Sequence, residues 1–236
     1  MEASTKRVLL IRHCQSDLNA ACEAIKADGG VLEELIRVRQ SPHYIDAPLT
    51  EKGRLQAEAL KAELENVHIS KVFVSPLRRC LQTVKIVFSE HPSFPAIIVL
   101  PELTEQVKTC HGISVGSLEN EYPEFDWSAM PPYHYLYDMC SLKEKDLLQE
   151  RAATRSFQEV MTERIAEIYP QQWEKKRRLK KRAKKVVELL KEEFPTSRGS
   201  ICVLSHRGLS RRIYQEVHGK ASDITLKNGQ AYDLEL

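Results

Sequence analysis

The 236-residue sequence lacks several features that define large protein classes. It has no run of about 20 apolar residues, which a membrane-spanning helix needs. The four apolar residues at 8–11 are too few for the core of a signal peptide. Its six cysteines include no Cys-x-x-Cys pair, so their spacing does not indicate a zinc knuckle. The formal net charge is only +2, so no overall attraction to nucleic acid or membrane follows.

These absences favour a soluble globular protein with reduced thiols, expected in the cytoplasm with the nucleus as the alternative compartment. No internal repeat or low-complexity linker divides the chain. Residues 1–236 are therefore expected to form a single domain.

Short apolar runs alternate with amphipathic segments along the chain. Strands are predicted at 8–11, 71–74, 97–100 and 200–204, with a last strand near a sheet edge within 229–236. Helices are predicted from Ser16 or Asp17 to Gly29, from about Thr50, over 77–88 and after 206, whereas 38–48 is expected to be a loop. This order predicts an α/β fold, with a mostly parallel, doubly wound sheet flanked by helices.

Residues 106–150 break this rhythm. The segment is rich in glycine, proline and aromatic residues, a composition typical of long irregular insertions. It is predicted to be a lid or cap inserted over an active site, and the alternative is a structural segment that packs against the rest of the fold. Two further helices are expected, one that stops at Pro170 and one from about 172 to 193.

Polar side chains follow four of the predicted strands. Because the carboxyl ends of parallel strands meet at one edge of a sheet, these side chains are expected to converge there. Arginine forks bind phosphate oxygens, a neutral imidazole can attack phosphorus, and a carboxylic acid can protonate the departing oxygen. The set indicates phosphoryl transfer without a metal or other cofactor. In chain order, the residues are Arg12 and His13; Ser75, Arg78 and Arg79; Glu102 and Glu105; and His206 and Arg207.

Residues 12–19, RHCQSDLN, resemble the signature R-H-G-x-S-x-x-N of the histidine phosphatase, or phosphoglycerate-mutase-like, superfamily. Further blocks agree in order and spacing across residues 7–236, with 106–170 the divergent part. Residues 46–57 are similar to D-x-P-L-T-x-x-G-x-x-Q-A, 75–83 to S-P-L-x-R-A-x-Q-T, 103–105 to L-x-E, and 203–206 to the block that holds the second histidine.

The resemblance implies a role for each matching residue. His13 would be the nucleophile that carries the phosphoryl group, and Glu105 would be the proton donor. The phosphoryl group would be held by Arg12, Asn19, Arg79 and His206. Arg79 rather than Arg78 fits the register of its block, and Glu102 is the alternative acid outside the motif.

Two residues depart from the pattern. Cys14 stands where the family usually has glycine, and either packs the turn or makes the site oxidisable. Arg207 follows the second histidine where glycine is common, and it either contacts substrate or points to solvent. The acid-phosphatase and phytase branch has aspartate there, so this branch is disfavoured. Residues 114–126 resemble the eukaryotic phosphomutase-like, broad-range phosphatase branch.

Nine of the eleven residues at 175–185 are Lys or Arg. As a helix, this run would have one apolar face, which favours a solvated amphipathic helix packed on the sheet. The alternatives are a nuclear signal or a patch for nucleic acid or acidic membrane.

The sequence therefore predicts a phosphatase that hydrolyses a small phosphomonoester through phosphorylated His13. The alternatives are a phosphomutase, which residues 105–109 disfavour because they lack the E-R-x-Y-G-like stretch of the glycolytic mutases, and a non-catalytic binding module with a phosphatase-like fold. Neither a nucleic acid nor a membrane is the favoured partner, and the sequence indicates neither the substrate nor the oligomeric state.

Overall fold

A computed structural model describes residues 6–106, 115–130, 142–168, 174, 176–219, 222 and 224–236. The strands are β1 (Val8–Arg12), β2 (Ile69–Val74), β3 (Ala96–Val99), β4 (Ser200–Ser205) and β5 (Ala231–Asp233). The helices are α1 (Asp17–Ala27), α2 (Leu32–Arg39), α3 (Glu51–Leu64), α4 (Arg78–Phe88), α5 (Val115–Glu121), α6 (Leu142–Arg151), α7 (Phe157–Ile168), α8 (Lys176–Thr196) and α9 (Arg207–His218). Two short 3-10 turns are η1 (Pro42–Tyr44) and η2 (Pro101–Leu103).

The strands form one sheet in the order β3-β2-β4-β1-β5. The pairs β1–β4, β4–β2 and β2–β3 are parallel, and β5 runs antiparallel to β1 at the edge. The mostly parallel α/β sheet and the edge position of the last strand are thus confirmed.

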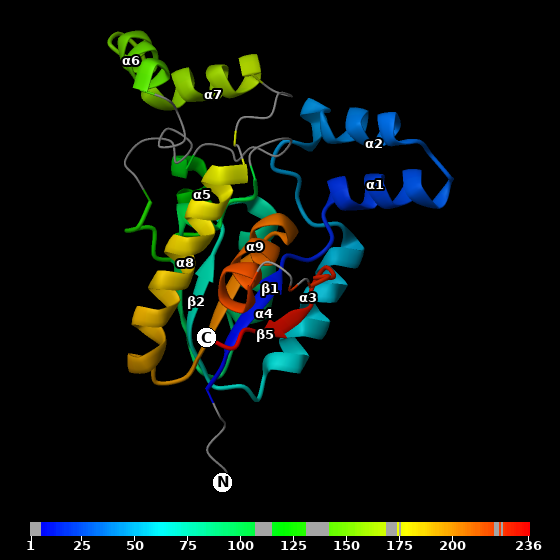
Figure 1. The fold of residues 1–236 in the computed structure, drawn as a ribbon, viewed down its shortest axis with the longest axis vertical. Coiled ribbons are helices and arrows are strands. Elements are labelled where there is room, and N and C mark those ends of the chain that lie inside the picture. Colours follow the sequence, from blue (N-terminus) through cyan, green and yellow to red (C-terminus); the bar gives the residue numbers. More distant parts are fainter. Residues whose placement is uncertain are drawn as a thin grey trace.

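Helices cover both faces of this sheet (Figure 1). Successive side chains of a strand point to opposite faces, so Leu9 and Ile11 join the cluster around α3 and α4, whereas Val8 and Leu10 join the cluster around α8 and α9. Burial on both faces explains why the strands are continuous apolar runs in the sequence.

Local contacts bring the N-terminal helices close to the end of β1. Ser16 caps α1 and Thr50 caps α3, each by accepting a hydrogen bond from a backbone amide of the first turn. Gly53 of α3 approaches the backbone carbonyl of Gln15 so closely that a Cβ atom would lie 2.0 Å from that oxygen. A glycine is therefore needed at this position to hold the loop after His13 in place.

The expected loop at 38–48 is wrong in part, because residues 38 and 39 end helix α2 and 42–44 form η1. Helix α2 has apolar residues at helical spacing, Leu32, Leu35 and Ile36, but none of its residues is buried, so packing in the core does not fix where it begins. Its start is instead fixed by Glu34, whose side chain accepts from the Val31 amide at 3.0 Å.

The predicted insertion is described only in part, since residues 107–114 and 131–141 lie outside the described residues. Its described middle part packs beside β3, where Asp126 exchanges backbone hydrogen bonds of 2.8 and 2.9 Å with Ile97 and Val99. This described part of the segment packs along the edge of the sheet. That the segment also forms a lid over an active site stays a prediction. Helices α6 and α7 lie beyond the carboxyl ends of the strands (Figure 1).

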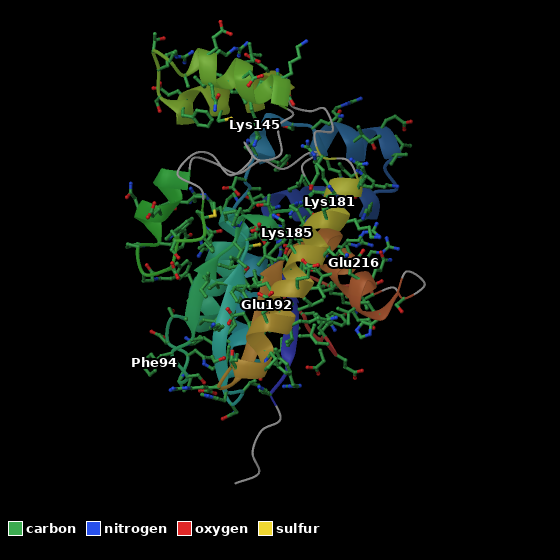
Figure 2. The ribbon with its side chains drawn as sticks, turned by 60° about the vertical axis from the view of Figure 1, so that its left-hand side comes forward. Phe94, Lys145, Lys181, Lys185, Glu192 and Glu216 are labelled. Atoms are coloured by element: carbon green, nitrogen blue, oxygen red, sulfur yellow. The ribbon has the colours of Figure 1, made fainter. Side chains whose placement is uncertain are left out.

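The predicted amphipathic character of the basic run is seen in the described part of α8. Its apolar face is buried against the sheet, and Lys181 and Lys185 point outward (Figure 2). No described helix is both long and apolar enough to cross a membrane.

Candidate active site

A cavity of about 480 Å³ lies at the carboxyl ends of β1 and β4. Side chains from the strand ends, α1, α2 and α9 surround it, so it occupies the edge where open α/β sheets bind ligands. Its described lining residues are Arg12, His13, Ser16, Leu18, Asn19, Cys22, Glu23, Lys26, Arg39, Arg79, Glu105, Gln106, Arg207, Gly208, Arg211 and Asn228. Five of the six predicted site residues belong to this set; the sixth, His206, is buried and contacts the ring of His13.

His13 is 4% exposed, and its ring orientation is fixed by its own chain. Its Nδ1 lies 2.7 Å from the carbonyl oxygen of Cys14. Because a carbonyl only accepts, Nδ1 carries the hydrogen and Nε2 keeps its lone pair. Burial, followed by the positive charges of Arg79 and Arg12, lowers the pKa of His13 well below its ordinary value of 6.5. The imidazole is therefore neutral near pH 7, with Nε2 as its nucleophilic atom.

His206 stacks at a tilt against His13, with ring centroids 5.1 Å apart. Its Nδ1 lies 3.1 Å from a guanidinium nitrogen of Arg79, and its Nε2 lies 2.8 Å from the hydroxyl of Ser75. Since arginine only donates, Nδ1 accepts and Nε2 donates to Ser75. Burial and the charge of Arg79 also lower the pKa of His206 well below its ordinary value.

Arg79 joins the two histidines. Its Nε donates to His13 Nε2 at 3.3 Å, and its Nη1 lies 4.0 Å from the buried carboxylate of Asp46. By contrast Arg78, its neighbour in α4, points to the surface and pairs with Glu121. The structure thus places Arg79 in the site and Arg78 outside it.

Arg12 and Asn19 complete the floor of the cavity. Arg12 donates one bond to the carbonyl of Leu226 at 3.1 Å, while its buried Nε has no hydrogen-bond partner within the described part of the chain. A buried, unpaired donor in a cavity is suited to an anion. Burial lowers the pKa of Arg12, which Glu105 partly offsets.

Asn228 was not predicted from the sequence. Its side-chain amide donates to the carbonyl of His13 at 2.8 Å and to the Oδ1 of Asn19 at 3.1 Å. It belongs to the loop before β5, and the only sequence signal for it is an Asn-Gly turn, in which Gly229 adopts a φ of +68°.

Glu105 reaches the cavity from the turn after β3. Its carboxylate accepts from the amides of Gln106, at 2.8 Å, and Gly208, at 3.4 Å. A Cβ atom on Gly208 would lie 2.6 Å from that carboxylate, so the glycine permits the approach. The alternative acid, Glu102, does not line the cavity, and its side chain faces Lys185 at 3.7 Å.

One residue of the basic run supports this turn. Arg182 donates to the carbonyl oxygens of Glu102 and Thr104 and forms a two-bond pair with the buried carboxylate of Glu174. The sequence offered no signal that separates Arg182 from its exposed neighbours. Only the structure distinguishes it, because Arg182 lies on the side of α8 that faces η2.

Cys14 is fully buried in the core cluster, and its amide donates to the hydroxyl of Thr83 at 3.2 Å. Burial raises the pKa of its thiol to about 11. A protonated, buried thiol reacts slowly with oxidants, so the packing alternative is favoured over an oxidisable site. Within the described residues, no cluster of three His, Cys, Asp or Glu side chains could hold a metal ion.

The geometry defines an α/β protein with an arginine-lined cavity beside two buried, neutral histidines. A family model described as the histidine phosphatase superfamily (branch 1) matches residues 8–141. The chain belongs to the histidine phosphatase superfamily.

Two curated relatives match shorter stretches. Fructose-2,6-bisphosphatase TIGAR B of Danio rerio is 39% identical over 64 residues, which is 26% of this chain and 25% of the relative. A 2,3-bisphosphoglycerate-dependent phosphoglycerate mutase of Thermoplasma acidophilum is 34% identical over 82 residues, which is 35% of this chain and 33% of the relative. The match thus spans a third or less of each relative's length.

Two solved structures share the fold. Phosphoglycerate mutase of Bacillus anthracis has a TM-score of 0.55 at 14% identity, covering 97% of this chain and 86% of that one. Phosphoserine phosphatase of Entamoeba histolytica, solved with 3-phosphoglyceric acid, has a TM-score of 0.51 at 13% identity, covering 96% and 89%. At these identities the likeness concerns the fold alone. The resemblance to the broad-range phosphatase branch stays a prediction.

Proposed function

We propose that this chain is a phosphatase that hydrolyses small phosphomonoesters through a phosphorylated His13. The observation that carries the proposal is the contact of Arg79 with both buried, neutral histidines at the base of the cavity. This arrangement presents a lone pair on His13 Nε2 next to a fixed positive charge, which are the two elements needed to attack a phosphoryl group.

The first step transfers the phosphoryl group to the enzyme. The lone pair of His13 Nε2 forms a bond to phosphorus while the ester P–O bond breaks. Glu105 gives its proton to the departing alkoxide, which leaves as an alcohol. Arg12 and Arg79 donate to the equatorial oxygens, where negative charge gathers in the transition state, and His206 orients Arg79 by accepting its hydrogen bond.

The second step restores the enzyme. Water attacks phosphorus, Glu105 takes up its proton, and the P–N bond breaks to release inorganic phosphate and neutral His13. The hydrogen bond from Nδ1 to Cys14 holds the ring in the same orientation through both steps.

The test measures phosphate release from a panel of sugar phosphates, nucleotides, phosphoglycerates and inositol phosphates. His13→Ala is expected to abolish release, while His43→Ala, which removes an exposed histidine outside the cavity, is the matched control. Acid-quenched wild-type protein should lose its bound phosphate, and alkali-quenched protein should retain it, as for a phosphoramidate. Near-normal activity of His13→Ala would refute the covalent mechanism, and phosphate moved within a substrate instead of released would identify a mutase.

A further inference from the structure

The loop at residues 226–230 packs against the end of β1. The carbonyl oxygen of Leu226 accepts from the guanidinium of Arg12 at 3.1 Å, and the backbone amide of Gly229 donates to the carbonyl oxygen of Arg12 at 3.1 Å. Between these two contacts, the side chain of Asn228 is half-buried and lines the cavity. The loop is therefore part of the wall of the candidate active site.

The orientation of the Asn228 side chain follows from its two partners. One of its polar atoms lies 2.8 Å from the backbone carbonyl oxygen of His13. Because a carbonyl only accepts, this atom is the amide nitrogen of Asn228 and not its oxygen. The same nitrogen donates its second hydrogen to the Oδ1 of Asn19, at 3.1 Å. Asn228 thus uses one N–H group on the backbone of the nucleophile and the other on a side chain that lines the cavity.

The orientation of the Asn19 side chain is fixed by two donors that meet at one atom. Its Oδ1 accepts from Asn228 and also, at 3.3 Å, from the backbone amide of Ser16. Since both partners donate, the oxygen of Asn19 is turned toward the protein and the nitrogen is its remaining polar group. Within the described residues no group accepts from this nitrogen, and Asn19 lines the cavity. Its N–H groups are therefore available to a ligand.

The direction of this amide decides how Asn19 interacts with an anion. A phosphoryl oxygen only accepts, so an N–H group of Asn19 stabilises it, whereas the oxygen of a reversed amide would repel it. The bond from Ser16 is longer than most N–H···O hydrogen bonds, so Asn228 supplies the shorter of the two bonds that hold Oδ1 in place.

We propose that Asn228 is a positioning residue, which holds the side-chain amide of Asn19 with its nitrogen toward the phosphoryl group. Asn228 acts through Asn19 and not on the substrate, because both of its own N–H groups are already bonded. The antiparallel return of β5 along β1 brings the loop to this place (Figure 1). The inference rests on the proposed function for the identity of the anion.

A double-mutant cycle tests whether Asn228 acts through Asn19. Calorimetry measures the Kd of inorganic phosphate for the wild type, Asn19→Ala, Asn228→Ala and the double variant. Asn19→Ala should weaken binding by ~10- to 100-fold, the range for a hydrogen bond to a charged group, and Asn228→Ala should lose a large part of the same factor. The double variant should bind at most about twofold more weakly than Asn19→Ala, because Asn228 then has no amide left to position.

Gln230→Ala is the matched control and should keep the wild-type Kd within about twofold. It removes a side-chain amide from the same loop, but this amide accepts from the hydroxyl of Tyr232 and does not line the cavity. An unchanged Kd for Asn228→Ala would overturn the proposal. Effects of the two single substitutions that multiply in the double variant would overturn it as well, since Asn228 would then act independently of Asn19.

The side-chain amide signals of Asn19 give a readout that a purely structural role would not change. In a proton–nitrogen correlation spectrum these signals are assigned by their loss in Asn19→Ala. They should shift when inorganic phosphate is added to the wild type, and the shift at saturation should be smaller in Asn228→Ala, where the amide is less firmly held. Signals that stay in place while phosphate binds to the wild type would contradict the proposal.

These binding measurements need no turnover, so they separate the positioning role from the phosphatase function. Effects that do not multiply, together with shifted Asn19 signals, support the positioning role even if the wild-type protein releases no phosphate from esters. Effects that multiply refute it even if hydrolysis is normal. A wild-type protein that binds no inorganic phosphate would also refute it, whatever the hydrolysis assay shows.

Discussion

Arg182 and Glu174 form a two-bond ion pair, with N–O distances of 2.8 and 2.7 Å. Glu174 is fully buried, and the same guanidinium donates to the carbonyls of Glu102 and Thr104. The pair therefore connects the start of α8 to the turn that carries Glu105. A buried ion pair adds little net stability, but it fixes the groups that it connects.

Arg182→Lys should lower activity through the position of Glu105 rather than through the nucleophile. Lysine keeps the charge opposite Glu174 but cannot make the planar fork. Turnover of an alkyl phosphate, whose leaving group needs a proton, should fall by about 10-fold or more relative to p-nitrophenyl phosphate, whose leaving group hardly needs one. The ratio of the two rates is measured, because the fraction of folded enzyme cancels in it.

Lys181→Gln is the control, since the side chain of Lys181 is exposed on the next position of α8 (Figure 2). An unchanged rate ratio in Arg182→Lys, with both rates reduced alike, would leave Arg182 a purely structural residue.

Arg79→Lys should be far more damaging than Arg78→Lys. Arg79 contacts both histidines, and lysine cannot reach both with fixed donors. Loss of one preorganised donor typically lowers kcat by ~10²- to 10³-fold. Arg78 makes only a partly exposed pair with Glu121, so its substitution should change kcat by no more than a few fold. Steady-state kinetics of both variants decide this, and the opposite order would show that the wrong arginine was assigned to the phosphoryl group.

The stability of the fold should fall as the pH is lowered below the ordinary histidine pKa of 6.5. His13 and His206 have lowered pKa values in the folded state, so below that pH the unfolded chain binds protons that the folded chain does not. Each histidine should then remove up to about 1.4 kcal/mol of unfolding free energy per pH unit, until its own folded pKa is reached. Above about pH 7.5 this contribution vanishes.

Urea unfolding of wild type and His13→Asn between about pH 7.5 and pH 5 measures this effect. The difference in unfolding free energy between the two proteins at about pH 7.5 gives the packing cost of the substitution. As the pH is lowered from there, the unfolding free energy of the variant should fall less steeply than that of the wild type. Parallel slopes for the two proteins would show that His13 does not contribute to the pH dependence of the unfolding free energy.

The parts of the site that could be predicted are those that short sequence patterns define. Apolar runs that are buried on both faces end in the polar residues at 12–13 and 205–206, and parallel pairing brings these ends together. The block at 46–57 includes Gly53, whose lack of a Cβ atom permits the close approach to Gln15.

The missed parts depend on contacts between distant segments. Asn228 reaches His13 only because β5 returns antiparallel to β1, and Arg182 differs from its basic neighbours only in what α8 packs against. Helix α2, which supplies Arg39 to the cavity, is short and packs only Leu35 and Val38 partly against a core cluster. Tertiary pairing of this kind leaves no local pattern in a single sequence.

The last prediction separates the two candidate acids. Glu105 lines the cavity, whereas Glu102 faces Lys185 on the outside of the same turn. Glu105→Gln removes the proton donor for the leaving oxygen, so turnover of alkyl phosphates should fall by ~10²- to 10⁴-fold, the usual range for general acid catalysis. With p-nitrophenyl phosphate the loss should be smaller, although the later role of Glu105 as the base for water keeps part of the penalty.

Glu102→Gln is the matched control, because it makes the same change three residues away and should alter neither rate by more than a few fold. Measuring both variants on both substrates therefore distinguishes loss of the acid from general damage to the turn, which would lower the two rates equally. If Glu102→Gln shows the leaving-group-dependent loss and Glu105→Gln does not, the acid is Glu102, and the phosphohistidine mechanism is then tested by His13→Ala alone.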